Sequence, residues 1–206
     1  LKELNLPNAY FVEEKVLSPR RAFSRAHPVC YNTFLMSIAS TDQIADQVRA
    51  TLSQKGLTIT DQDLNRPWGG YFVIDENQID EFIDAYFPSE RGKINDNGAK
   101  LSPKILLVAP NARLSWQYHH RRAELWKVVA GPVAVYLSDT DQQPENPQIF
   151  KTGQVITNKR TMRHRLAGTG DWGIVAEIWS HTDPSEPSDE DDIVRLADDF
   201  GRQTPK

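Results

Sequence analysis

From Lys104 onward the sequence breaks into short segments with the composition and alternation of β-strands, and this pattern limits the chain to few folds. Turn sequences such as Pro110-Asn111 and Gly131-Pro132 separate the segments. Short strands with a turn about every eight to twelve residues are typical of a β-sandwich or a β-barrel. The expected strands are Ile105–Ala109, Arg113–His119, Leu125–Ala130, Val133–Leu137, Gln154–Thr157, Arg163–Leu166 and Trp172–Trp179.

The residues before and after these strands predict a few helices. Apolar residues recur at helical spacing in 41–55 and again in 77–87, with a short strand at 57–60 and a turn leading into a strand at 66–74 between them. The acidic segment Ser188–Phe200 is expected to form one short C-terminal helix.

These elements suggest three parts of the chain. Residues 41–103 are expected to form an extension that packs on a barrel built from residues 104–202. Residues 1–40 lack periodicity and are expected to form an extended or disordered leader, or to precede a natural start near Met36.

The composition excludes several classes of partner. A net charge of −4 over 206 residues gives no electrostatic footprint for nucleic acid. No apolar run approaches the roughly 20 residues needed to cross a bilayer, and the N-terminal segment lacks the apolar region of a secretory signal. The single cysteine, Cys30, excludes a disulfide within the chain and fits a reducing compartment. We therefore expect a cytoplasmic protein without a nucleic-acid or membrane partner.

Metal-ligand residue types gather in two of the expected strands. Gln117, His119, His120 and Glu124 lie within eight residues, and His164 follows about 40 residues later. Residues two apart in a strand share a face, so Gln117 and His119 point the same way and His120 points the opposite way. A hairpin between this strand and the next would bring Glu124 opposite them, and His164 would complete a site for a divalent metal.

The spacing alone also allows a structural interpretation. His119 and His120 could lie on the surface at a strand end, and Glu124 could pair with Arg121 or Arg122. The residues by themselves leave these two interpretations open.

The same segments resemble the two sequence motifs of the cupin superfamily. The first motif fits from position 111 to Gly131, with Asn111 in the place of its first glycine and Gln117 in that of its first histidine. The second motif fits from Gly153 to Gly168 and keeps His164, but Lys159 replaces its proline, Thr161 its glycine and Gly168 its asparagine. The resemblance implies a double-stranded β-helix, the jelly-roll barrel of cupins, with a few peripheral helices.

A narrower resemblance covers about residues 64–202. The chain is similar to the C-terminal cupin domain of type II phosphomannose isomerases, which are often fused to a mannose-1-phosphate guanylyltransferase; no glycine-rich nucleotide loop precedes the cupin motif here. The segments that carry this resemblance are Arg66–Tyr71, Ala112–His119, Arg122–Val129, His164–Leu166, Glu190–Arg195 and Asp198–Arg202. It implies one divalent metal ion, zinc before manganese, cobalt, iron or nickel, held by Gln117, His119, Glu124 and His164.

The resemblance also implies an activity, the conversion of mannose 6-phosphate to fructose 6-phosphate through a metal-stabilised enediol or enediolate. Glu177 is a candidate base, or alternatively a carboxylate paired with an arginine at the edge of the core. Arg165 is a candidate for a catalytic or substrate contact, or alternatively forms an outward-facing salt bridge. Lys104 and Arg113 are further candidates for the phosphate.

Two other functions fit the same motifs. One is a non-catalytic cupin that binds a sugar or nucleotide sugar, and the other is a different metal-dependent cupin enzyme, such as an iron oxygenase. Gln117 as an extra ligand disfavours the facial triad of two histidines and one carboxylate that iron oxygenases use. By analogy with other cupins, a homodimer is expected.

Overall fold

The computed structural model describes residues 39–94 and 100–204, and the predictions for the leader and for Cys30 fall on residues outside these ranges, apart from positions 39 and 40. Two helices and two short 3-10 turns accompany eleven strands in this part of the chain. In chain order the elements are α1 (Thr41–Gln54), β1 (Ile59–Arg66), β2 (Gly69–Ile74), η1 (Glu76–Gln78), α2 (Ile79–Tyr86), β3 (Leu101–Val108), β4 (Trp116–His119), β5 (Arg122–Ala130), β6 (Val133–Ser138), β7 (Gln148–Phe150), β8 (Val155–Asn158), β9 (Arg163–Gly168), β10 (Gly173–His181), η2 (Glu190–Asp192) and β11 (Ile193–Ala197).

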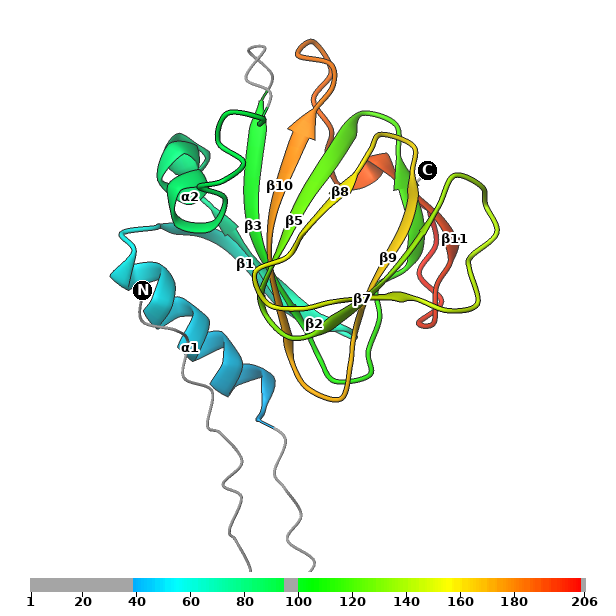
Figure 1. Ribbon diagram of the computed structural model, residues 1–206, viewed down its shortest axis with the longest axis horizontal. Coiled ribbons are helices and arrows are strands. Elements are labelled where there is room, and N and C mark those ends of the chain that lie inside the picture. Colours follow the sequence, from blue (N-terminus) through cyan, green and yellow to red (C-terminus); the bar gives the residue numbers. More distant parts are fainter. Residues whose placement is uncertain (1–38, 95–99, 205–206) are drawn as a thin grey trace, which may run out of the picture. The chain divides into compact units, whose positions relative to one another are not determined.

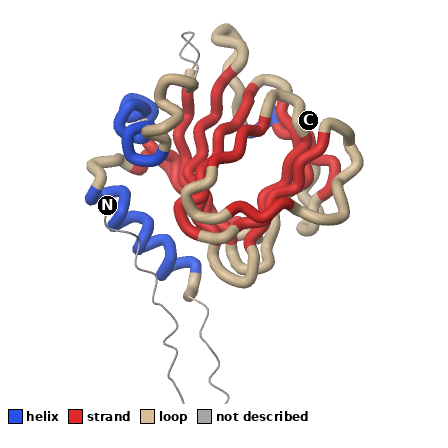
Figure 2. Tube along the Cα trace, in the orientation of Figure 1, coloured by secondary structure: helices blue, strands red, loops and turns tan. Residues whose placement is uncertain are grey.

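The strands form two antiparallel sheets that face each other around a common interior (Figures 1 and 2). The first sheet has the order β1-β2-β3-β10-β5-β8, and the second has the order β11-β4-β9-β6-β7. This is a double-stranded β-helix, so the prediction of a mainly β cupin barrel is confirmed. In the segment that was expected to pack on the barrel, β1 and β2 continue the sheet that contains β3.

The strand sequences explain which side chains face the interior. In β5 buried and half-buried residues alternate along the whole strand, as expected for a strand with one face toward the core. In contrast, β3 and β10 are buried over nearly their full length and carry apolar residues on both faces. On the outer side of this sheet α1 contacts β1, and α2 contacts and covers part of β3 (Figure 1).

Apolar side chains fill one part of the space between the two sheets. Trp126 and Val128 of β5 meet Leu166 of β9 there, and each is almost completely buried. The remaining buried members of this cluster are Trp68, Leu106, Val108, Val133, Val135, Ile156 and Val175. Polar side chains occupy the other part of the interior and form the site described below.

The predicted C-terminal helix is wrong. Only Glu190–Asp192 forms a 3-10 turn, and Ile193–Ala197 is the strand β11, which pairs antiparallel with the edge of β4. The acidic residues that were expected to begin a helix instead cap this turn, where the Asp189 side chain accepts a hydrogen bond from the backbone N–H of Asp191. Ile193 and Val194 then favour a strand, because β-branched residues fit a pleated, half-buried surface.

The predicted hairpin between β4 and β5 is also wrong. Only His120 and Arg121 separate the two strands, yet β4 pairs with β9 and β11 whereas β5 pairs with β10 and β8. The chain therefore crosses from one sheet to the other at this corner of the barrel. As a result Glu124 faces Gln117 and His119 across the interior and not along a shared ladder.

Candidate active site and metal centre

Three ligand-type side chains converge inside the barrel from three strands. His119 lies on β4, Glu124 on β5 and His164 on β9, and their donor atoms all lie within 4.8 Å of one another. The His119 Nε2 atom is 3.1 Å from Glu124 Oε1, and the His164 Nε2 atom is 3.3 Å from Glu124 Oε2. Each side chain is at most 3% exposed, so the cluster is shielded from bulk water.

Backbone carbonyl groups fix the orientation of both imidazole rings. His119 Nδ1 lies 3.2 Å from the carbonyl oxygen of Asp192, and His164 Nδ1 lies 2.9 Å from that of Met162. Because a carbonyl oxygen can only accept a hydrogen bond, each Nδ1 is the protonated donor and each Nε2 presents a lone pair. A hydrogen bond from Nδ1 to a backbone carbonyl is typical of histidines that bind metals through Nε2.

The protonation of the cluster also suits a metal ion. Burial lowers the pKa of His164 to about 4, so its imidazole is neutral at neutral pH. Burial alone would raise the pKa of Glu124, but His119, His164 and the Arg122 guanidinium hold this pKa well below its usual range. A neutral imidazole beside an ionised carboxylate is a donor pair that suits a divalent cation.

Buried polar atoms without partners lie in this part of the barrel. Among the described residues, Glu124 Oε2, His164 Nε2 and both polar atoms of the Asn158 amide have no hydrogen-bond partner. Asn158 is the direct cross-strand partner of Glu124, so the two side chains project from the same face of their sheet. Leaving such groups unpaired is costly, and the residues present therefore fit a bound metal ion.

The predicted ligand Gln117 lies beside this cluster. Its Nε2 atom is 3.4 Å from His119 Nε2, and its Oε1 atom accepts a hydrogen bond of 2.5 Å from the Ser115 hydroxyl. Ligation through the amide oxygen requires the carboxamide to rotate by half a turn, after which the Ser115 hydroxyl would accept from Nε2. His120 is exposed, as the strand alternation predicts.

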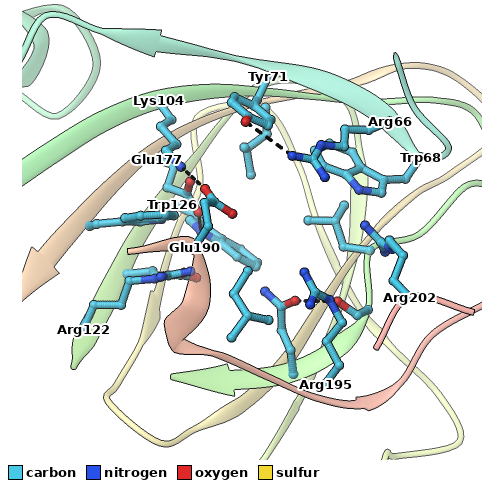
Figure 3. A pocket seen from close by; sticks show the side chains of 17 residues that line it. Arg66, Trp68, Tyr71, Lys104, Arg122, Trp126, Glu177, Glu190, Arg195 and Arg202 are labelled. Carbon is cyan, nitrogen blue, oxygen red and sulfur yellow. Dashed lines mark hydrogen bonds and ion pairs between the residues drawn. The ribbon is translucent and has the colours of Figure 1, made fainter. Parts of the chain in front are cut away.

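A pocket opens onto the cluster and is rich in charged side chains (Figure 3). Gln117 and Glu124 form part of its wall, together with Glu177 and Lys104. Ten further polar or aromatic lining residues were not predicted as site residues, namely Arg66, Trp68, Tyr71, Ser115, Arg122, Trp126, Trp179, Glu190, Arg195 and Arg202. Arg122 stands two residues before Glu124 in a strand, so its inward direction could have been deduced from alternation.

The positively charged guanidinium group of Arg122 lies next to the cluster. Its Nε donates a hydrogen bond of 2.9 Å to Glu124 Oε1, and one terminal nitrogen lies 3.2 Å from His119 Nε2. The guanidinium is fixed by the Ser188 hydroxyl and by stacking over the Trp179 ring at 3.5 Å. A metal ion on His119 Nε2 would replace the contact between Arg122 and this nitrogen.

Glu177 lies in the pocket at the centre of the first sheet. It is 4% exposed, and its cross-strand partners are Lys104 on β3 and Trp126 on β5. Trp126 Nε1 donates a hydrogen bond of 2.8 Å to Glu177 Oε1. Burial and the nearby charge of Glu124 raise the pKa of Glu177 to about 8.

Lys104 lines the pocket, but its charge is already compensated. Its Nζ donates a hydrogen bond of 2.8 Å to Glu190 Oε1 and lies 3.4 Å from the centre of the Trp179 ring. These contacts place the ammonium group on the same side of the pocket as Glu177 (Figure 3).

Arg165 and Arg113 do not line the pocket, which corrects the prediction that they contact the substrate. Arg165 is buried and donates to the Leu114 carbonyl at 2.6 Å and to Asp199 Oδ1 at 2.6 Å. Arg113 pairs with the same Asp199 carboxylate. Arg165 stands next to His164 in β9, so alternation directs it away from the interior, and its predicted structural alternative, a salt bridge, is the arrangement observed.

The fold and the site together define a cupin barrel with a buried cluster of two histidines and one carboxylate that could hold a metal ion. Residues 79–198 match the family described as "Mannose-6-phosphate isomerase C-terminal". The chain belongs to this family, as its motifs predicted.

Curated relatives are longer than this chain. The alginate biosynthesis protein AlgA of Pseudomonas aeruginosa is 31% identical over 177 residues, which cover 81% of this chain and 29% of that protein. The mannose-1-phosphate guanylyltransferase of Escherichia coli is 32% identical over 143 residues, which cover 68% of this chain and 23% of that protein. The chain thus spans less than a third of the length of these relatives.

Among solved structures, KdgF from Halomonas sp. matches with a TM-score of 0.42 and 13% identity over 64% of this chain and 91% of that chain. None of the helices in the described part of the chain combines the length and apolar character that a bilayer crossing requires. The expected homodimer and the expected cytoplasmic location stay predictions.

Proposed function

We propose that this chain interconverts an aldose phosphate and a ketose phosphate, with mannose 6-phosphate and fructose 6-phosphate as the substrate pair. One observation carries the proposal: a single pocket joins a cluster suited to a metal ion with a buried carboxyl group whose pKa is about 8. Membership of the phosphomannose isomerase family supports the choice of substrate.

Aldose–ketose isomerisation moves a proton between C1 and C2 and develops negative charge on the substrate oxygens. A divalent metal held by His119, Glu124 and His164, with Gln117 as the additional ligand, would supply Lewis-acid stabilisation of that charge. Glu177 is the group in the pocket suited to move the proton, because a general base works best with a pKa near the working pH.

The neighbours of Glu177 support this role. The Trp126 indole N–H holds one carboxyl oxygen and thereby fixes the direction of the other. Lys104 lies on the same side of the pocket and uses one of its three ammonium N–H groups for Glu190, so the others can donate to an enediolate oxygen and favour it over the neutral sugar. The aromatic rings of Trp126 and Trp179 in the pocket wall limit the access of water to the reacting carbons.

The test is an assay of the purified metal-loaded chain with mannose 6-phosphate in D2O. We expect formation of fructose 6-phosphate with deuterium incorporated at the exchanging carbon, because the proton passes through a group that equilibrates with solvent. Glu177→Gln should lower kcat about 10²- to 10⁴-fold, which is the usual contribution of a positioned base. Glu145→Gln changes an exposed carboxylate outside the pocket and should leave kcat unchanged.

Two results would contradict the proposal. Full metal occupancy without turnover of any hexose phosphate would favour the non-catalytic, sugar-binding alternative. Turnover that is equal in the wild type and in Glu177→Gln would assign the proton transfer to another residue.

A further inference from the structure

Three arginines gather on the side of the pocket opposite Lys104 and Glu177 (Figure 3). Arg66 ends β1, Arg195 lies in β11, and Arg202 lies in the segment after β11. These segments are far apart in the sequence, so the fold brings the three guanidinium groups together. None of them takes part in the proposed proton transfer.

Arg195 is directed into the pocket by the pairing of β11 with β4. Its cross-strand partner is Gln117, and Ile193 is likewise paired with His119. Residues paired directly across an antiparallel ladder project from the same face of the sheet. Arg195 therefore shares the inner face with the candidate metal ligands.

The charge of Arg195 lacks a counterion among the described residues. One terminal nitrogen donates a hydrogen bond of 2.7 Å to the Gln203 carbonyl, but the buried Nε atom has no partner there. Arg66 and Arg202, by contrast, each pair with a carboxylate, that of Asp63 and Asp198 respectively. Three guanidinium groups thus face two paired carboxylates, which leaves an excess of positive charge.

This excess is unfavourable in the free protein. Burial and the nearby charge of Arg202 lower the pKa of Arg195, which means that its surroundings destabilise the charged form. Arg195 is half-buried, and a cation that is partly removed from water is stabilised when an anion with hydrogen-bond acceptors lies beside it. The vacant donors of Arg195 can be satisfied by such an anion bound in the pocket.

We infer that Arg195, flanked by Arg66 and Arg202, binds the phosphate group of the substrate. A guanidinium group forms paired, charge-assisted hydrogen bonds with phosphate oxygens, and the net positive charge of the cluster favours a dianion over a neutral sugar. The identity of the sugar rests on the proposed function, whereas the phosphate site rests on the arginines alone. The site would confer selectivity for phosphorylated sugars.

The position of Arg195 suits a hexose phosphate. Along β11 it lies two residues beyond Ile193, the partner of His119, which corresponds to about 7 Å. Its direct partner is Gln117, and Glu177 lies on the opposite side of the same pocket (Figure 3). With the phosphate at Arg195, the C1–C2 end of the sugar therefore extends toward the cluster and Glu177.

The experiment is calorimetric titration of the full chain with inorganic phosphate, mannose 6-phosphate and mannose. We expect Arg195→Gln to weaken the binding of phosphate and of mannose 6-phosphate about 10- to 100-fold, the usual effect of losing charged hydrogen bonds. The matched control is Arg113→Gln, because Arg113 pairs with Asp199 outside the pocket. This control should bind both ligands within about twofold of the wild type, as expected for a charge distant from the site.

Thermal unfolding shows whether Arg195→Gln folds. If it does not, Arg195→Lys is the second variant, because it keeps the positive charge. Since lysine lacks the planar fork of arginine, we expect this variant to bind phosphate about tenfold more weakly than the wild type. Unchanged phosphate affinity in a folded Arg195→Gln or Arg195→Lys variant would overturn the inference, as would an equal loss in Arg113→Gln.

The phosphate site and the isomerase can fail separately. If mannose 6-phosphate binds through Arg195 but is not converted, the inference stands and the proposed function fails. If conversion occurs and Arg195→Gln leaves the KM unchanged, the function stands and the inference fails. If both hold, Arg195→Gln should raise KM more than it lowers kcat, because the phosphate contact is made equally in the ground state and the transition state.

Discussion

The carboxyl group of Glu177 keeps its proton up to a much higher pH in the folded protein than in the unfolded chain. Its pKa rises from the usual 4.5 to about 8 because burial disfavours the charge and Glu124 is nearby, although Lys104 and Arg122 act in the opposite direction. Between these two values the folded state keeps a proton that the unfolded state has released. The free energy of unfolding contributed by this group must then fall as the pH rises.

We therefore expect the metal-free protein to lose stability between about pH 5 and pH 8 through Glu177, and Glu177→Gln to remove this loss. The stability advantage of the variant over the wild type should grow with pH and reach a few kcal/mol, on the order of 1.4 kcal/mol per pKa unit. Urea unfolding in the presence of a chelator at pH 5, 6.5 and 8 measures the difference. The contribution of His164 to the pH dependence is the same in both proteins and cancels in the comparison. A stability difference that does not change with pH would contradict the prediction.

Two residues stand in the left-handed region of backbone conformation where the cupin motifs have glycine. Asn111 has φ of 59° and Thr161 has φ of 62°. A β-branched residue is strained there, whereas asparagine tolerates the conformation well. The Thr161 N–H donates a hydrogen bond of 2.9 Å to the His119 carbonyl, so this strained turn borders the candidate metal centre.

Replacing Thr161 by glycine should relieve this strain. We expect Thr161→Gly to raise the free energy of unfolding by about 1 kcal/mol, since the relief exceeds the added entropy of the unfolded chain. Thr161→Ala is the control, because alanine keeps the Cβ atom and should give no such gain. Chemical denaturation of the two variants measures the contrast, and equal stabilities would show that the turn is not strained.

Among the elements, the segment from Ser188 to Ala197 depends most on one buried side chain. Asp192 is 6% exposed and accepts hydrogen bonds from the backbone N–H groups of His120 and Arg121 at 3.0 and 2.9 Å. Its carboxylate also accepts a hydrogen bond of 2.7 Å from the Ser188 hydroxyl and pairs with the Arg121 guanidinium at 3.7 Å. These bonds attach the segment to the corner between β4 and β5, where the carbonyl of Asp192 also orients His119.

We expect Asp192→Ala to lower the free energy of unfolding by about 2 to 4 kcal/mol, because it leaves two backbone N–H donors and the Ser188 hydroxyl donor without an acceptor. The neighbouring Asp191 is exposed, and Asp191→Ala should cost less than about 0.5 kcal/mol. Guanidinium denaturation of both variants makes the comparison. Similar losses in the two variants would mean that the contacts of Asp192 do not hold the segment in place.

The strand β11 in this segment was not predicted from the sequence, whereas the orientation of the residues in β5 was. The alternation in β5 was sufficient to predict which residues face the core, because period two is a local property of the chain. The strand β11 was mistaken for a helix because its acidic start resembles a helix N-terminus, while its true state depends on pairing with the edge of β4. Tertiary pairing of this kind overrides local propensity.

In the candidate site, too, local features were predicted from the sequence and contacts between distant segments were not. That Gln117 and His119 share a face followed from alternation, and the cupin resemblance added Glu124 and His164. That Glu124 approaches across the barrel could not be deduced, because β4 and β5 belong to different sheets. The arginine cluster was missed for a related reason: its members come from segments that only the fold brings together.

At the scale of the described barrel, the candidate metal centre joins the two sheets. His119 and His164 belong to the sheet that contains β4 and β9, and Glu124 belongs to the sheet that contains β5. A metal ion bound to all three would therefore cross-link the sheets through side chains that are far apart in the unfolded chain. The free energy of metal binding should then appear as stability of the fold.

We expect a zinc concentration of about 1,000 times Kd to stabilise the protein by about 4 kcal/mol. For a folded region of this size, each kcal/mol raises Tm by about 2 to 4 °C, so Tm should rise by about 10 °C, and a chelator should reverse the rise. His119→Ala should abolish most of this shift, whereas His120→Ala should keep it, because His120 points out of the barrel from the next position in the chain. Differential scanning calorimetry with and without zinc measures the shift for the three proteins. An equal shift in both variants would mean that zinc stabilises the protein from a site other than the cluster between the sheets.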